Sequence, residues 1–186
     1  KMATGWAGGP LLDIGAKAYA QRMEQFTGGR IKIQTFPGGA LGNALKVPET
    51  VKNGIADLGH TWMGYDWGKD PTTVLFGGYA GSFDTELMLH WLYEGGGVPM
   101  QRQFREEQDG IISLVLFIRT AEVFLHSRKP VKTLADLKGL KIRTMENKVH
   151  LAAWKTAGVN PTPMAWGEVF TALQQKAIDG QENPIA

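Results

Sequence analysis

Cysteine is absent from this chain of 186 residues, and its absence excludes disulfides and thiolate chemistry. Long apolar runs are missing as well. The longest, Ile111 to Ile118, contains a serine and is far shorter than the roughly 18 residues that a membrane-spanning helix needs. Neither sign of charge dominates, since 20 basic and 18 acidic residues give a net charge of +2. We therefore expect no basic surface for a nucleic-acid backbone.

Motifs for a metal centre, a nucleotide site or a catalytic nucleophile are also missing. The two histidines closest in sequence, His126 and His150, are 24 residues apart, so we expect the histidines to be structural and predict no metal site. The stretches "GGALG" and "GGYAG" lack the spacing of a dinucleotide or phosphate loop and indicate turns. Without a G-x-S-x-G elbow, no catalytic residue and no cofactor are predicted, although a triad assembled from distant residues stays open.

The first third of the chain alternates strand and helix patterns. Residues 1–4 are typical of a strand interior, and strand patterns return at residues 30–36 and 55–58, with a helix of about residues 44–53 between them. Apolar residues recur at steps of four and three, as on one stripe of an amphipathic helix, at Leu12, Ala16, Tyr19, Met23 and Phe26. This order predicts a layered α/β fold with a largely parallel sheet.

The second half repeats this alternation. Helices are predicted at residues 85–93, 99–108, 147–157 and 167–176, and strands at 111–118, 122–127, 141–144, 159–164 and 178–181. The strands 111–118 and 122–127 are either a crossover between two lobes or a hairpin. Thr133 and Asp136 form a variant of the capping box before a short helix. We predict a first α/β lobe over residues 1–121 and a second over residues 122–186.

Several side chains that suit a ligand follow the predicted strands. An arginine, an asparagine and three tryptophans lie at the end of a predicted strand, just past one, or in the loop that opens the next helix: Arg143, Asn183, Trp6, Trp62 and Trp166. Ligands of open α/β sheets collect outside the carboxyl ends of the strands. Because a lone tryptophan is usually a core residue, it is their occurrence together with a cation that favours a binding site.

The stretch "DLKGLKIRTMENKVHLAAWKTAGVNPTPMAWGEVFTALQQKAIDGQENP", residues 136–184, closely resembles the solute-binding proteins of TRAP (tripartite ATP-independent periplasmic) transporters, the DctP-like family. Upstream, "GGRIKIQTFPGGALG" and "VKNGIADLG" extend the resemblance over nearly the whole chain. "GHTWMGYDWGKDP" and "HWLYEGGG" look like the branch associated with 2-oxo acids and related monocarboxylates.

The resemblance implies a periplasmic binding protein of the type II kind, with two α/β lobes, mixed sheets flanked by helices and a cleft that closes on the ligand. Arg143 matches the arginine that forms a salt bridge with the ligand carboxylate, Asn183 an asparagine that bonds the same region, and Trp166 an aromatic residue that closes on the ligand. Trp62 and Trp6 match loops of the first lobe that face the cleft. The implied partners are a small organic acid and the membrane permease subunits.

Two departures from the family pattern narrow the ligand. Many relatives that bind dicarboxylates or sialic acid have another arginine about 20 residues before Arg143, where this chain has Val123, so a monocarboxylate is favoured. The metal-coordinating acidic motif of part of the 2-oxo-acid branch is replaced by "DGQENP", so no metal is expected. Family members are longer, and we expect this sequence to lack its C-terminal part. The alternatives are the effector-binding domain of a regulator and, less favoured, an enzyme on the same scaffold.

Overall fold

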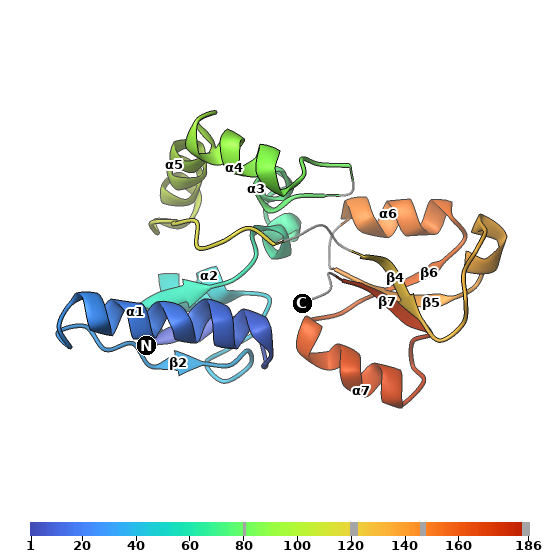
Figure 1. The fold of residues 1–186 in the computed structure, drawn as a ribbon, viewed down its shortest axis with the longest axis horizontal. Helices are drawn as coiled ribbons and strands as arrows, with labels where there is room; N and C mark the ends of the chain where they lie inside the picture. Colours follow the sequence, from blue (N-terminus) through green and yellow to red (C-terminus); the bar gives the residue numbers. More distant parts are fainter. Residues whose placement is uncertain (80, 120–122, 146–147, 184–186) are drawn as a thin grey trace. The chain divides into compact units, whose positions relative to one another are not determined.

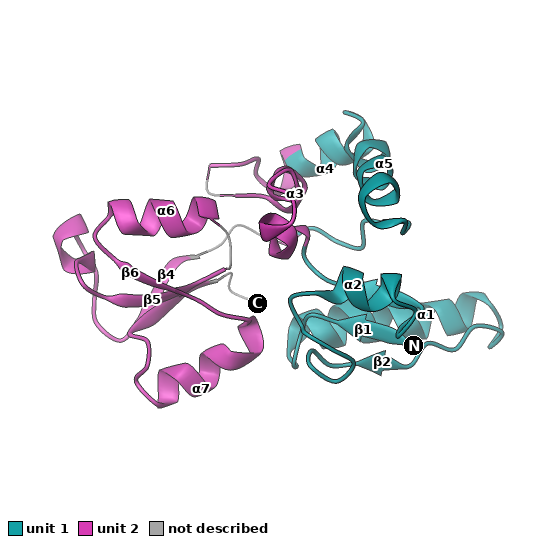
Figure 2. Cartoon of the chain, turned by 180° about the vertical axis from the view of Figure 1, so that it is seen from behind, with its two compact units in different colours: residues 1–62, 88–118 teal, residues 63–87, 119–186 magenta. Residues whose placement is uncertain are grey.

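The structure, a computed structural model, describes residues 1–79, 81–119, 123–145 and 148–183 (Figure 1). The chain divides into two compact units (Figure 2). Unit 1 contains residues 1–62 and 88–118, and unit 2 contains residues 63–87 and 119–186. The predicted lobe boundaries, 1–121 and 122–186, stay a prediction.

Unit 1 is built on a parallel sheet of three short strands in the order β2-β1-β3. These are β1 (Met2–Thr4), β2 (Thr35–Phe36) and β3 (Leu58–His60). Its helices include α2 (Val47–Lys52), α4 (Thr85–Tyr93, which begins in unit 2) and α5 (Gly97–Asp109). The predicted strand 30–36 shortens to β2 because β1 offers partners only to Thr35 and Phe36. A parallel sheet covered by helices is confirmed.

The first predicted helix forms as two segments with different winding. A π-helix, η1 (Leu11–Lys17), leads into α1 (Ala18–Phe26). Because a π-helix bonds each residue to the fifth along, its faces drift from the 3.6-residue period on which the predicted stripe was based. Leu12 and Ala16 are buried as expected, but Phe26 at the end of the stripe is 83% exposed, so its predicted burial is wrong.

Residues 111–118 do not form the predicted strand. Alternate apolar side chains are exposed there, with Ile112 at 63% and Leu114 at 71%. A strand needs a neighbour for its backbone N–H and C=O groups, and no described strand pairs with this segment. The hairpin alternative is therefore not formed within the described ranges. The chain does pass from unit 1 to unit 2 directly after this segment.

Unit 2 contains a mixed sheet in the order β4-β7-β5-β6. Its strands are β4 (Val123–Ser127), β5 (Lys141–Thr144), β6 (Asn160–Pro163) and β7 (Gly180–Asn183). β5 is parallel to both of its neighbours, whereas β4 is antiparallel to β7. The mixed sheet predicted from the family resemblance is confirmed.

Two helices, α6 (Lys148–Thr156) and α7 (Val169–Gln174), cover opposite faces of this sheet (Figure 1). Shorter segments complete unit 2: η2 (Met63–Gly68), α3 (Thr73–Gly77), η3 (Leu134–Leu137) and η4 (Trp166–Glu168). The predicted capping box of Thr133 and Asp136 begins η3. Because successive strand residues point to opposite faces, Ile142 packs with the α6 residue Trp154, and Arg143 points to the α7 face.

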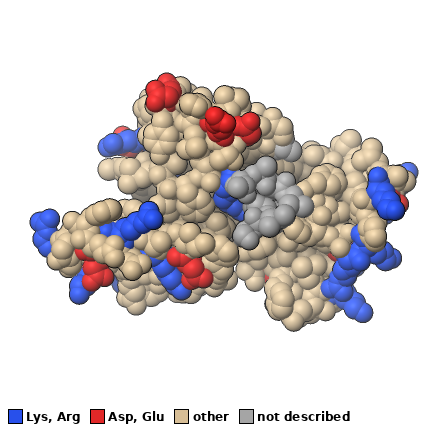
Figure 3. Space-filling view, in the orientation of Figure 1, with Lys and Arg blue, Asp and Glu red and all other residues tan. Residues whose placement is uncertain are grey.

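Basic and acidic side chains are interspersed over α1 and its neighbours on the face drawn in Figure 3. Two exposed ion pairs belong to this region, Lys17 with Asp13 and Lys32 with Glu24. Such mixed charge over α1 and its neighbours agrees with the small net charge of the sequence. Within the described ranges, no helix combines the length and the apolar character that crossing a bilayer requires.

Candidate functional site

Arg143 is completely enclosed in unit 2, with 1% of its surface exposed. It occupies the third position of β5, which is flanked on both sides by parallel strands. Its Nε and Nη2 donate to the carbonyl oxygen of Met164 at 3.2 and 3.1 Å, and Nη1 donates to the carbonyl oxygen of Glu182 at 3.3 Å. Backbone carbonyls from both sides of β5 therefore position the guanidinium.

The charge of Arg143 has no carboxylate partner among the described residues. Its Cζ lies 5.7 Å from the ring centroid of Trp166, within the range of a cation–π interaction. A guanidinium has five N–H donors, and the three bonds to carbonyls leave one on each Nη atom. A buried cation with two remaining donors is suited to a carboxylate, which accepts a bidentate pair of bonds.

Glu182 is a buried carboxylate that belongs to the frame of this site. Its Oε1 accepts hydrogen bonds from Thr144 Oγ1 at 2.9 Å and from the backbone N–H of Met145 at 3.1 Å. These bonds tie β7 to the carboxyl end of β5, where the chain turns towards α6. At the other end of β5, Asp179 accepts from the backbone N–H of Lys141 at 2.8 Å. Both ends of the strand that carries Arg143 are therefore anchored, one to β7 and the other to the residue that precedes it.

His150 is a further buried polar residue of this region, 9% exposed and located in the first turn of α6. Burial is the main cause that lowers its pKa below the usual 6.5; Glu182 opposes this shift and Arg143 adds to it. Its Nδ1 has no hydrogen-bond partner among the described residues. The sequence predicts a structural histidine here, and this stays a prediction. The sequence feature that points to another role is its position seven residues after Arg143, in the helix that follows the strand.

The five predicted ligand residues are divided between the two units. Arg143 and Trp166 are in contact in unit 2. Asn183 ends β7, directly after the residue whose carbonyl accepts from Arg143. The side chains of Asn183 and Val123 lie outside the described part of the chain. Trp62 belongs to unit 1 and is half-buried.

Trp6, the other predicted residue of unit 1, is buried in a cluster of rings. Its indole Nε1 donates to Nδ1 of His60 at 3.1 Å, and the His60 ring makes an edge contact with Phe117. Burial lowers the pKa of His60 from 6.5 to about 4, so the ring is neutral and its Nδ1 can accept. Gly15 lies against this cluster, because an added Cβ would be 2.8 Å from His60 Cε1.

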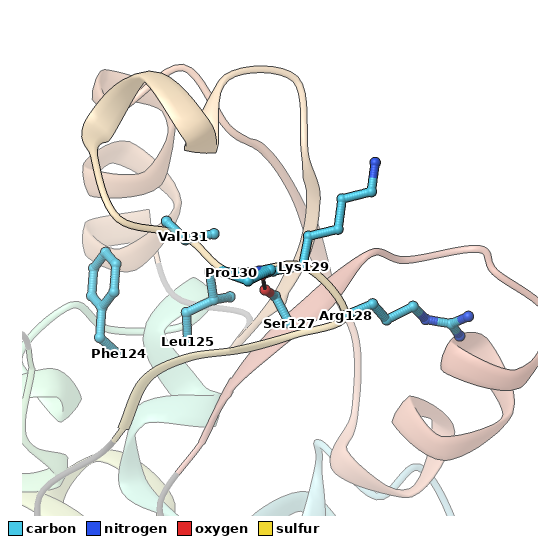
Figure 4. A pocket seen from close by; sticks show the side chains of 7 residues that line it. All are labelled: Phe124, Leu125, Ser127, Arg128, Lys129, Pro130 and Val131. Atoms are coloured by element: carbon cyan, nitrogen blue, oxygen red, sulfur yellow. Dashed lines mark hydrogen bonds between the residues drawn. The ribbon is translucent and has the colours of Figure 1, made fainter.

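A surface groove of about 480 Å³ lies along β4 and the loop that follows it (Figure 4). Its lining residues are Phe124, Leu125, Ser127, Arg128, Lys129, Pro130 and Val131. Figure 4 shows that the charged ends of Arg128 and Lys129 extend away from the apolar side chains of the groove. Arg143 is not among the lining residues of this groove. We therefore place the candidate site at the buried cation, and the groove is not part of it.

The comparisons with known proteins identify relatives. Relatives include a solute-binding protein of Verminephrobacter eiseniae, 36% identical over 93% of this chain and 51% of its own length. The 2,3-diketo-L-gulonate-binding periplasmic protein YiaO of Escherichia coli is 35% identical over 92% of the chain and 52% of its own length. A monocarboxylate 2-oxoacid-binding periplasmic protein of Nostoc is 30% identical over 98% of the chain and 49% of its own length.

Solved structures of TRAP solute-binding proteins are also similar to this chain. The TRAP periplasmic solute-binding protein of Polaromonas with bound D-erythronate is 35% identical, has a TM-score of 0.74 and aligns with 98% of this chain and 59% of its own. The protein of Roseobacter denitrificans with bound β-D-glucuronate is 28% identical, with a TM-score of 0.81 over 98% of this chain and 60% of its own. The family and the fold class predicted from the motifs are confirmed.

The chain spans about half the length of the curated relatives that it matches. The model of the DctP family, described as "Bacterial extracellular solute-binding protein, family 7", matches residues 2–186. A match of this extent covers both units and every residue of the candidate site. The chain therefore belongs to the DctP family of bacterial extracellular solute-binding proteins.

Proposed function

We propose that the protein is the extracytoplasmic solute receptor of a TRAP transporter, which binds a small organic acid at Arg143 and delivers it to a membrane permease. The observation that carries this proposal is the buried guanidinium, which has two donors left and no carboxylate partner among the described residues. A periplasmic location is part of the proposal, as is binding without turnover, because the members of the family are receptors.

The energetics support an anchoring role for Arg143. Charge-assisted hydrogen bonds contribute roughly 1.5–3 kcal/mol each where water is excluded. A micromolar dissociation constant corresponds to about −8 kcal/mol, so two such bonds supply about half of it before ordering costs. The remainder has to come from apolar and aromatic burial, for which Trp166, already at the guanidinium, is the first candidate.

The ligand that we propose is a monocarboxylate. The acids named for the relatives above, D-erythronate, β-D-glucuronate, 2,3-diketo-L-gulonate and 2-oxo acids, share one carboxylate and further oxygen atoms. Val123 stands where, by the family resemblance, many relatives that bind dicarboxylates or sialic acid have another arginine. One cationic anchor suits one carboxylate.

The remaining predicted contacts stay part of the proposal. Asn183 follows Glu182 at the end of β7, close in sequence to an Arg143 partner, and is proposed to bond the same carboxylate. Trp62 and Trp6 are proposed to contact the other end of the ligand from the first lobe. Because the indole N–H of Trp6 is bonded to His60, its contribution would come from the ring surface.

Calorimetry on an Arg143→Lys variant tests the anchor. The probes are D-erythronate, D-glucuronate and pyruvate. Lysine keeps the charge but cannot form the planar pair of bonds, so we expect at least about 10-fold weaker binding of the tightest probe. Arg102→Lys is the matched control, because Arg102 is 53% exposed on α5 and pairs with Glu106 one turn away. Wild-type affinity in Arg143→Lys, or no binding of any probe to the wild-type protein, would overturn the proposal.

A further inference from the structure

Only two buried side-chain polar atoms lack a hydrogen-bond partner in the described part of the chain, Thr61 Oγ1 and His150 Nδ1. An unpaired buried polar atom is unfavourable, because it has lost its bonds to water and gained none in the protein. Such atoms are rare in folded proteins, and a bound molecule is one of the things that complete them. The first turn of α6, where His150 lies, follows the carboxyl end of the strand that carries Arg143.

The surroundings of His150 connect it to the Arg143 site. Glu182 on β7 accepts from Thr144 and Met145 at the carboxyl end of β5, and α6 begins at Lys148, three residues after Met145. Glu182 and Arg143 both act electrostatically on the imidazole. Burial keeps the ring neutral at neutral pH. A neutral imidazole has one N–H and one bare nitrogen, so its Nδ1 can donate to an oxo oxygen or accept from a hydroxyl, depending on the tautomer.

Arg143 and His150 approach the carboxyl end of β5 from opposite faces of the sheet. Arg143 points to the α7 face, where it contacts Met164 and Trp166, and His150 belongs to the helix on the α6 face. A molecule at this end of the strand could reach both groups only with two separate polar parts. Its carboxylate would meet the guanidinium, and a second oxygen would meet the imidazole.

We propose that His150 is a further ligand-contacting residue of the Arg143 site, with its Nδ1 bonded to a hydroxyl or oxo oxygen of the bound carboxylate. This inference rests on the proposed function and adds a ligand class to it. The site takes hydroxy or oxo acids in preference to simple alkyl carboxylates, because an alkyl chain would leave the buried Nδ1 without a partner.

The test compares pairs of acids that differ only in these oxygens, D-erythronate with butyrate and pyruvate with propionate. Calorimetry measures their affinities for the wild-type protein and for His150→Phe, which keeps a ring of similar shape but has no nitrogen. We expect the variant to bind the preferred oxygenated acid about 10-fold more weakly and its alkyl counterpart with nearly unchanged affinity. His90→Phe makes the same substitution at an exposed position of α4 and is the control.

The stability of the His150→Phe variant is a second measurement, and it distinguishes a ligand contact from a structural histidine. Removal of an unpaired buried atom should leave the urea midpoint of the ligand-free His150→Phe variant unchanged or raised. A histidine that only supports the fold would give a lowered midpoint with unchanged affinity, and that result would overturn the inference. Partial recovery of affinity in His150→Asn, whose side-chain amide can replace Nδ1, would support it.

One measurement needs no substitution and covers the case in which His150→Phe does not fold. In imidazole ¹⁵N NMR of the wild-type protein, the Nδ1 resonance of His150 should shift when D-erythronate or pyruvate saturates the site. An unchanged resonance at saturation would refute the contact. If the wild-type protein binds none of the probe acids, the proposed function fails, whereas unchanged acid selectivity in His150→Phe would refute only the role of His150.

Discussion

Two buried histidines show how one residue type acquires two roles from its surroundings. His60 accepts from Trp6 at 3.1 Å and is part of a ring cluster, so its hydrogen bond is made within the protein. His150 is buried to the same extent, 9% exposed, but its Nδ1 has no partner among the described residues. Burial lowers the pKa of both rings. The partner, and not the burial, separates the structural histidine from the candidate ligand contact.

At the residue scale, His60 makes stability depend on pH. Folding lowers its pKa from 6.5 to about 4, so the folded protein favours the neutral ring. The free energy of unfolding has its full value above pH 6.5. It decreases by about 3 kcal/mol as the pH falls towards 4, because the unfolded chain then binds a proton that the folded ring does not. In urea unfolding between pH 6.5 and 4, His60→Asn, which retains an acceptor for Trp6 but does not titrate, should lose less stability than the wild-type protein.

His150 titrates in the same direction in both proteins, so the difference between their pH profiles isolates His60. Parallel profiles for wild type and His60→Asn over this range would show that the ring is not held neutral by the fold.

At the scale of elements, the candidate site depends on the tight association of β7 with its neighbours. Glu182 ties β7 to the end of β5, and Gly180 faces Ser127 on β4. A Cβ at residue 180 would lie 2.6 Å from the carbonyl oxygen of His126 and 3.1 Å from Ser127 Cβ. A backbone carbonyl in a strand pair cannot move aside as the end of a flexible side chain can. Glycine is therefore required here for close approach of two strands.

We expect Gly180→Ala to lower the free energy of unfolding by about 1–3 kcal/mol, since the added methyl group forces β4 and β7 apart. Chemical denaturation measures this change. Gly68→Ala is the matched control, because Gly68 is also in unit 2 and no atom lies within 4 Å of its added Cβ. Equal stability of the two variants would contradict the close packing of these strands.

At the scale of the whole molecule, the receptor proposal predicts a link between ligand and stability. A ligand that binds only the folded state stabilises it, by about 2.7 kcal/mol at a concentration 100 times its dissociation constant. The tightest probe acid should therefore raise the denaturation midpoint of the wild-type protein and have a much smaller effect on Arg143→Lys at the same concentration. An equal rise in both would place the bound acid somewhere other than at Arg143.

The predicted ligand contacts are divided between the two units of the chain. Arg143 and Trp166 meet within unit 2, through β5 and the segment after β6. Trp6 and Trp62 belong to unit 1, and their part in binding stays a proposal about the whole receptor. A titration of tryptophan emission with the probe acids would report on both units at once.

Local sequence determined much of this protein. The short run at 141–144, the capping box at Thr133 and the helix at 85–93 were predicted because neighbouring residues decide a cap, a period or a turn. The motif around Arg143 also indicated the family, which the comparisons confirmed.

Tertiary structure decided the features that depend on partners remote in sequence. Residues 111–118 have a strand composition but no described strand to pair with. Phe26 is exposed and does not continue the buried stripe, because η1 is wound as a π-helix. Trp6 found its acceptor 54 residues away. Among the described residues, Arg143 has no carboxylate partner and Nδ1 of His150 has no hydrogen-bond partner. These features depend on tertiary structure too, because burial and hydrogen bonding are settled only when distant segments pack together.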